Sequence, residues 1–187
     1  ARMAKILQRS AEAEALARDH ELMRDRVNAS LWDDREGVYF SRHWDGRLEA
    51  RPTLASFYPL IAGIPTRMRA ETMVRHALGN PQSWVGWPLP TLSPEDPAHD
   101  PAAPWRGAVS PVSNYIIYAG LKRSGYDDVA AQLAQRSGAL SRKQSGLGGG
   151  WRNWYDAATG EGIGAGWQRS GALLPLMALQ EPADAGR

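Results

Sequence analysis

Residues 105–115 read Trp-Arg-Gly-Ala-Val-Ser-Pro-Val-Ser-Asn-Tyr, and this stretch decides the fold because it closes a loop and opens an apolar helix. Eight of the chain's 13 prolines lie between Pro81 and Pro111. Proline removes a backbone donor and breaks helices, so no helix can run through residues 81–111. A loop of about thirty residues is uncommon in a compact domain and is usually functional.

Helical periodicity occupies most of the remaining chain. Apolar positions at a four-three spacing predict a long amphipathic helix over residues 4–31, with a face formed by Leu16, His20, Met23, Val27 and Leu31. Further helices are expected over residues 53–63, 65–78, 112–124, 127–137 and 170–180. Two short strands around Asp45-Gly46 should form one hairpin at about residues 38–50. Residues 146–150 lack the Lys and Ser/Thr of a phosphate loop and indicate a hinge.

Composition excludes several classes of function. The net charge is only +2 and no basic stripe is interleaved with aromatic residues, which argues against nucleic acid as a partner. There is no cysteine, so disulfides and zinc–thiolate sites are excluded. The four histidines show no metal-ligand spacing, and we expect no metal and no cofactor. No apolar run is long enough for a membrane span. The compartment stays open, with the cytoplasm as the default expectation.

Tryptophan is unusually frequent, with eight Trp against two Phe. Its flat apolar ring and single N–H donor suit stacking on a sugar. Burial in the core is the alternative for any one of them. Functional residues concentrate in loops, and five Trp lie in Gly/Pro-rich loops, at positions 84, 87, 105, 151 and 154.

The stretch at residues 105–115 resembles the "WRGPxWxxxNY" segment of the helical-barrel glycoside hydrolases, which include trehalases, processing α-glucosidases and mannosylglycerate hydrolases. Other segments that match this family follow in the expected order, at residues 31–39, 57–64, 88–90, 120–126 and 154–162. The ordered set covers roughly residues 15–180.

The resemblance implies a mainly α fold built from the helical hairpins of an (α/α)6 toroid, here a partial barrel with one short β-hairpin. The helix, loop, helix alternation favours stacked helical hairpins over a parallel sheet. A complete toroid of six hairpins needs well over about 300 residues at ordinary helix lengths. Residues 1–187 are therefore expected to be the C-terminal part of a single catalytic domain whose N-terminal half is missing and would be its partner. One flank should expose unpaired apolar helix surface.

Inverting glycoside hydrolysis needs two carboxyls about 6.5–9.5 Å apart. The resemblance implies that the acid is an Asp in the missing half and that the base is a Glu in the pattern "ExYDPxTGEG". Residues 155–162 match this pattern and place Asn153 at the position of the Glu. Asn cannot take a proton, so the base is lost there. The chain also departs from the family at Ala108, Ser110 and Arg169.

Two nearby carboxylates are candidate substitutes for the base. Glu161 lies between two glycines, where the alternative is a solvated turn residue. Asp156 precedes Ala-Ala-Thr-Gly, which is typical of an Asx-turn or a helix N-cap.

The candidate substrate-binding residues are Trp87, Trp105, Arg106, Gly107, Asn114 and Tyr155. The Arg guanidinium and the Asn amide can both hydrogen-bond hydroxyls. For Arg106 the alternative is an ion pair with Asp96 or Asp100. For Asn114 it is a hydrogen bond at the helix start.

The first functional hypothesis is part of an inverting glycoside hydrolase that acts on α-linked glucosyl or mannosyl groups of small saccharides or glycosides. The isolated chain should be inactive. The second hypothesis, which Asn153 favours, is a non-catalytic carbohydrate-binding or scaffold domain derived from the same fold. A third is a lyase on the same toroid, for which no Tyr or His base can be singled out.

Overall fold

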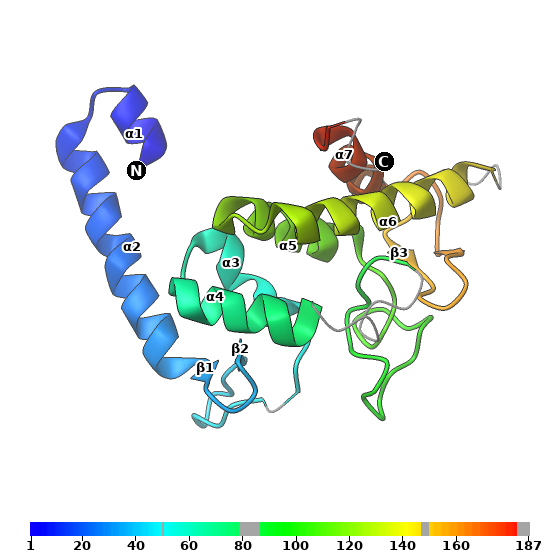
Figure 1. Cartoon of the computed structure of the whole chain (residues 1–187), viewed down its shortest axis with the longest axis horizontal. Helices are drawn as coiled ribbons and strands as arrows, with labels where there is room; N and C mark the ends of the chain where they lie inside the picture. The colour runs from blue at the N-terminus through cyan, green and yellow to red at the C-terminus, as the bar shows by residue number, and fades with distance from the viewer. Residues whose placement is uncertain (50, 79–86, 147–149, 183–187) are drawn as a thin grey trace.

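The computed structural model describes residues 1–49, 51–78, 87–146 and 150–182, and the fold is mainly helical, as predicted. The elements are, in chain order, α1 (Arg2–Ile6), α2 (Ser10–Ser30), β1 (Trp32–Asp33), β2 (Val38–Tyr39), the 3-10 turn η1 (Leu54–Phe57), α3 (Pro59–Ala62), α4 (Arg67–Met73), the π-helical turn η2 (Val74–Leu78), α5 (Pro111–Ser124), α6 (Asp127–Gly146), β3 (Trp154–Tyr155), β4 (Gly162–Ile163), the 3-10 turn η4 (Arg169–Ala172) and α7 (Leu173–Gln180). In Figure 1, α5 and α6 lie in the middle of the molecule, with the other elements around them.

The core forms where α5 packs against α3, α6 and α7. Two glycines allow these helices to approach closely. A Cβ on Gly120 would lie 2.7 Å from the Cβ of Leu60, and a Cβ on Gly138 would lie 2.9 Å from the Cβ of Ala178. Neither position has room for a side chain. Tight packing of this kind holds the ends of α5 and α6 in place, and the loops that carry the candidate site start from those ends.

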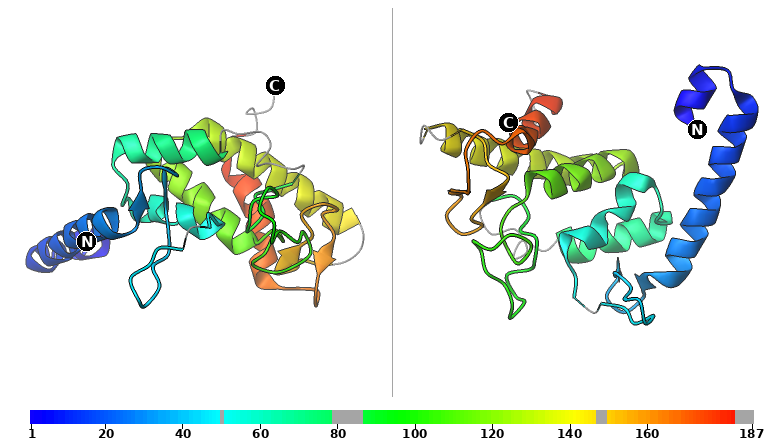
Figure 2. Two further views of the ribbon diagram at one scale, coloured as in Figure 1. Left: turned by 90° about the horizontal axis from the view of Figure 1, so that it is seen from below. Right: turned by 180° about the vertical axis from the view of Figure 1, so that it is seen from behind.

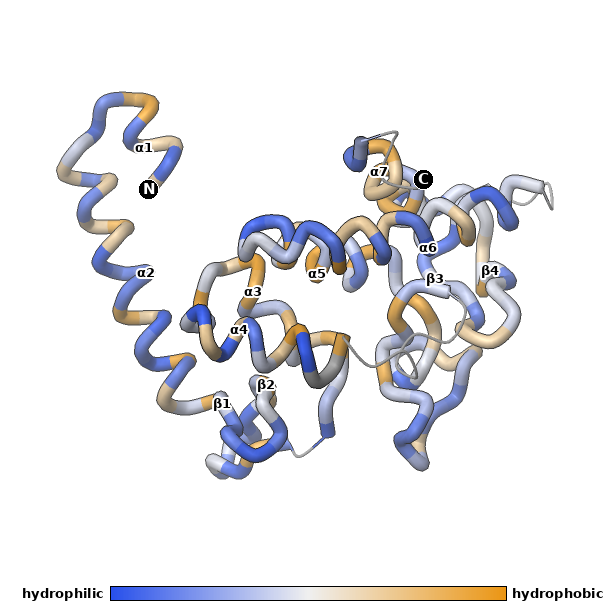
Figure 3. Tube along the Cα trace, in the orientation of Figure 1, coloured by the Kyte–Doolittle hydropathy of each residue, from blue (hydrophilic) through white to orange (hydrophobic). Residues whose placement is uncertain are grey.

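Helices α1 and α2, which we call the arm (residues 1–31), stand away from the other helices (Figure 2). Hydrophobic residues recur along α2 between hydrophilic ones (Figure 3). Within the predicted face, Val27 and Leu31 pack against the core, and the His20 ring contacts the carbonyl oxygen of Ala62 at 2.8 Å. Met23 is 55% exposed. The expected unpaired apolar surface is therefore present, and it includes Met3, Ile6, Leu7, Leu16, Leu22 and Met23.

The predicted short hairpin is present, but as a whole it lies closer to the N-terminus than the predicted residues 38–50. β2 starts at the predicted Val38, yet it pairs antiparallel with β1, with Trp32 opposite Tyr39. The Asp33 carboxylate accepts two backbone N–H groups and tightens the connecting turn, whose last residue, Gly37, has φ +66°. Around the predicted Asp45-Gly46 turn a single bridge forms, between residues 42 and 48. The turn itself is exposed, and Leu48 of the bridge packs against the core.

Three other predictions about the elements need correction. Gln8, with φ 55°, separates α1 from α2, and residues 53–63 form η1 followed by α3 rather than one helix. Helix α6 continues nine residues past the predicted end at 137, because Leu140, Ser141 and Gln144 are buried along it. The rest of the predicted hinge, residues 147–149, lies outside the described residues.

Candidate functional site

The long loop after residue 87 is anchored to the start of α5 by one buried amide. Asn114 is fully buried, and its Oδ1 accepts the backbone N–H of Leu89 at 3.0 Å. Its Nδ2 donates to the carbonyl oxygens of Leu89 and Ser110, both at 2.9 Å. The described contacts therefore give Asn114 the alternative role, a hydrogen bond at the helix start. Its prediction as a saccharide contact stays untested.

The same loop is tied to itself and to β3. The Thr91 hydroxyl accepts the N–H of Gly107 at 3.0 Å and donates to the carbonyl of Ala108 at 3.1 Å. Val109 and Tyr155 exchange backbone hydrogen bonds of 2.7 and 3.0 Å. The loop and the segment after residue 150 therefore lie side by side, as Figures 1 and 2 show. We call residues 87–110 and 150–171 the loop end.

An aromatic pair projects from the loop end. Trp105 is 67% exposed, and its ring meets the ring of Trp154 edge-to-face at a centroid distance of 4.7 Å. Its φ of 64° is unusual for a non-glycine residue. Such backbone conformations concentrate at functional sites. Gly107 fixes the turn behind the pair, because a Cβ there would lie 2.4 Å from the carbonyl oxygen of Asp100.

Asn153, which precedes Trp154 in the chain, is exposed and held by two polar neighbours. Its Nδ2 donates to Oε1 of Gln168 at 3.3 Å, and the Ser170 hydroxyl donates to its Oδ1. In this position Asn153 can donate and accept hydrogen bonds, but it has no proton to exchange. A carboxylate at this position would accept a hydrogen bond from the Ser170 hydroxyl.

The two candidate substitutes for the base occupy the turn that joins β3 to β4. Oδ1 of Asp156 accepts the N–H groups of Ala158 and Thr159, both at 2.8 Å, so Asp156 forms the Asx-turn that was its alternative role. Glu161 is exposed, and its carbonyl accepts the N–H of Asp156 at 2.8 Å. A catalytic role for Glu161 stays a prediction.

The other predicted substrate-binding residues differ in burial and in their partners. Arg106 forms the alternative ion pair, 3.5 Å from Asp100. Trp87 is half-buried under Gly160, with the Lys143 ammonium 5.2 Å from its ring centroid. Tyr155 is fully buried; burial raises the pKa of its hydroxyl, which accepts the N–H of Arg152 at 2.9 Å. Trp105 is therefore the exposed aromatic member of the predicted set.

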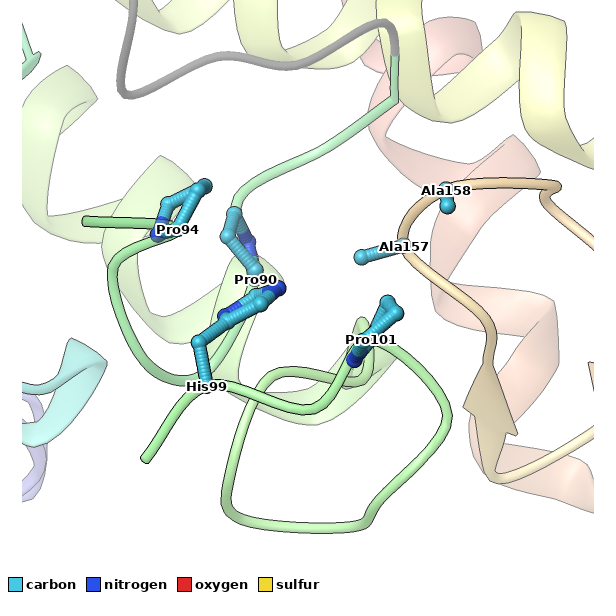
Figure 4. Close-up of a pocket in the computed structure, with 6 residues that line it drawn as sticks. All are labelled: Pro90, Pro94, His99, Pro101, Ala157 and Ala158. Atoms are coloured by element: carbon cyan, nitrogen blue, oxygen red, sulfur yellow. The ribbon is translucent and has the colours of Figure 1, made fainter. Parts of the chain in front are cut away.

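A pocket of about 110 Å³ lies where the long loop meets the turn after β3 (Figure 4). Its lining is Pro90, Pro94, His99, Pro101, Ala157 and Ala158. The lining is almost entirely apolar, and Nδ1 of His99 is already paired with the carbonyl of Leu92 at 3.0 Å. A saccharide pocket needs several convergent polar groups.

Within the described ranges, no three His, Asp or Glu side chains are grouped to hold a metal ion. No helix in that part of the chain has the length and apolar character of a membrane span. Trp84, noted above as a loop Trp, lies outside the described residues.

Sequence reasoning missed two residues of the loop end. Trp167 is 80% exposed with φ 60°, and its ring covers Gly150. The guanidinium of Arg152 lies against Gly162 and Gly166. The density of Gly around both residues was the available signal, but the contacts join residues well over two helical turns apart in the sequence, which no local pattern predicts.

Comparisons with known proteins agree with this architecture. The model of the mannosylglycerate hydrolase MGH1-like glycoside hydrolase domain matches residues 1–171. A mannosylglycerate hydrolase of Thermus thermophilus is 34% identical over 151 residues, which are 77% of this chain and 34% of that protein. The chain thus spans about a third of the length of this relative.

Two solved structures are similar. One is the GH63 mannosylglycerate hydrolase of Thermus thermophilus in complex with glucose, with a TM-score of 0.69 and 32% identity over 81% of this chain and 37% of that one. The other is the neutral trehalase Nth1 of Saccharomyces cerevisiae, with a TM-score of 0.72 over 88% of this chain and 30% of that one. At 20% identity the trehalase supports the fold alone.

The family model covers nearly the whole chain, and its relatives share the helical-hairpin architecture described above. The chain therefore belongs to the MGH1-like glycoside hydrolase domain family of mannosylglycerate hydrolases.

Proposed function

We propose that this chain is the C-terminal part of an (α/α)6-barrel glycoside hydrolase domain that acts, with inversion, on α-linked glucosyl or mannosyl groups of small saccharides or glycosides. The edge-to-face contact between the exposed Trp105 and the half-buried Trp154, which follows Asn153 in the chain, is the observation that carries the proposal. Trp154 is the chain neighbour of Asn153, the residue that the resemblance sets at the family's base position, and this supports a sugar-binding role for the pair. The remaining hairpins of the barrel, with the acid, would come from the upstream part of the domain.

Each part of the loop end has a role in this proposal. The Trp105 ring stacks on the apolar face of the sugar, and its edge-to-face contact with Trp154 holds it in place. Asn114 and Thr91 keep the loop rigid beneath it. A preformed surface loses little entropy when it binds a ligand.

Asn153 supports a second candidate, a non-catalytic carbohydrate-binding domain derived from the same fold. A positioned general base contributes about 10²–10⁴-fold to a rate, and an amide contributes none of it. The pair of tryptophans would bind the sugar in either case. The two candidates therefore differ in turnover and agree in binding.

A chimera separates them. Residues 1–171 replace the matching segment of the Thermus thermophilus mannosylglycerate hydrolase, so that the upstream half and its acid are present. We expect the chimera to bind saccharides but to turn over slowly, and Asn153→Glu to raise turnover at least about 100-fold. The chain alone should not hydrolyse an aryl α-glucoside, with or without this substitution.

The matched control in the chimera is Glu161→Gln, which should leave turnover unchanged. If Asn153→Glu has no effect and Glu161→Gln abolishes turnover, the base is Glu161 and the position of the family's Glu was wrongly assigned. If the chimera binds no saccharide, and Trp105→Ala changes nothing, both candidates fail.

A further inference from the structure

The Arg152 side chain fills a space that two glycines leave open. A Cβ on Gly162 would lie 2.4 Å from Cγ of Arg152, and a Cβ on Gly166 would lie 2.0 Å from its Nη1. Any other residue at either position would displace the guanidinium. We call Gly162 and Gly166, with the guanidinium between them, the arginine cradle.

The guanidinium in this cradle has no counter-ion among the described residues. Its Nε is buried without a hydrogen-bond partner, and the hydrogen bond recorded for Arg152 uses the backbone N–H. Two other arginines of the chain have partners, Arg69 in Asn28 and Arg51 in Asp96. A buried guanidinium N–H without an acceptor is costly, so a cradle built around Arg152 favours an anion.

The chain itself supplies little to neutralise Arg152. Oε1 of Gln144 lies 2.9 Å from the same Gly162 Cβ position, but it is a neutral acceptor. Outside the described residues, Asp184 is the one carboxylate side chain in the sequence. The acidic groups nearest in sequence, Asp156 and Glu161, belong to the β3–β4 turn described above.

Arg152 precedes Asn153 in the chain, and backbone and side-chain hydrogen bonds tie this segment to residues 168–170. The N–H of Gln168 donates to the carbonyl of Trp151 at 2.8 Å, and Asn153 contacts both Gln168 and Ser170. The segments on either side of the guanidinium are therefore fixed relative to each other. A fixed fork of N–H donors suits the two oxygens and single charge of a carboxylate.

We propose that Arg152 is an anion-binding residue that takes a carboxylate beside Asn153. The carboxylate belongs either to a small molecule bound there or to a side chain from the upstream part of the polypeptide. This inference rests on the missing counter-ion and does not depend on the proposed function.

The test follows the Nε–H signal of Arg152 by ¹⁵N NMR, assigned by its loss in Arg152→Lys. The protein is titrated with acetate at constant ionic strength, and acetamide is the uncharged control of the same shape. We expect a saturable shift with acetate and none with acetamide. The exposed Arg35, on the β1–β2 turn, is the matched control and should shift with neither.

Gly166→Ala should abolish the acetate response, because its methyl group takes the place of Nη1; circular dichroism checks that the variant is folded. The chimera distinguishes the two sources. An Nε–H signal that acetate still shifts indicates a free ligand, and one that is already shifted and insensitive to acetate indicates a side chain of the upstream half. Equal responses to acetate and acetamide, or equal responses of Arg152 and Arg35, would overturn the proposal.

Discussion

The arm is rich in regular secondary structure and poor in tertiary contacts, and the loop end shows the reverse. The arm is regular helix throughout most of its length, yet most of its apolar residues are exposed. The loop end has two short strands and one 3-10 turn, yet Asn114, Thr91 and Tyr155 hold it through buried hydrogen bonds. Regular secondary structure and extensive tertiary contacts therefore do not coincide in these two regions. The helices α5 and α6 supply much of the apolar core, whereas the loop end is held by a few polar side chains.

This contrast has a physical reason. A helix satisfies most of its own backbone groups, so the arm needs few outside partners for them. A loop that crosses the core must find partners for its N–H and C=O groups elsewhere. In this chain a few polar side chains provide them, which concentrates the stability of the loop end in single residues.

The largest effect is expected at Asn114. Asn114→Ala removes three hydrogen bonds and leaves the buried N–H and C=O of Leu89 unpaired, which should lower the free energy of unfolding by about 3 kcal/mol. Urea denaturation of the whole chain measures this. The exposed Asn153→Ala is the matched control and should change the value by less than about 0.5 kcal/mol. Equal losses in the two variants would mean that the loop end is not held by its buried amide.

A smaller effect, dependent on pH, is expected at Tyr155. Burial raises the pKa of its hydroxyl above the ordinary value of 10.0, while the N–H and the charge of Arg152 lower it in part. A pKa raised in the folded state contributes stability below the unfolded value, and this contribution is lost as pH rises through the folded value. Tyr155→Phe cannot ionise, and it loses one hydrogen bond worth about 1 kcal/mol.

We therefore expect Tyr155→Phe to be less stable than the parent chain at pH 8, and the difference to shrink above about pH 10. Thermal unfolding at both pH values measures it. Burial also raises the pKa of Tyr39 and Tyr126, so the parent and the variant share that alkaline loss, and the difference between them isolates Tyr155. A difference that does not change with pH would mean that Tyr155 is hydrated in the folded chain.

The sequence predicts local elements such as the helices, and it does not predict contacts between segments that are distant in the chain. Most helices follow from apolar spacing and from the positions of Pro and Gly, and the loop over residues 87–110 follows from its prolines. The hairpin was misplaced because Trp32 packs on Tyr39, a tertiary preference that no turn signal at Asp45-Gly46 encodes. Trp105 was identified through a motif, whereas Arg152 depends on glycines ten and fourteen residues downstream. Local patterns predict elements, and the cradle arises only when separate segments meet.

The smallest effect is expected on the arm. Met23 and Val27 lie one helical turn apart, but Met23 is 55% exposed, whereas Val27 packs against the core. Lys has nearly the helix propensity of Met, so Met23→Lys should change the free energy of unfolding by less than about 0.5 kcal/mol. Val27→Lys should lower the free energy of unfolding by at least about 1 kcal/mol more, because the lysine side chain and its charge would lie against apolar neighbours. Urea denaturation at two protein concentrations measures both. A large loss for Met23→Lys that grows with protein concentration would show that a second copy covers the arm, and a large loss independent of concentration would show that the arm folds back on its own chain.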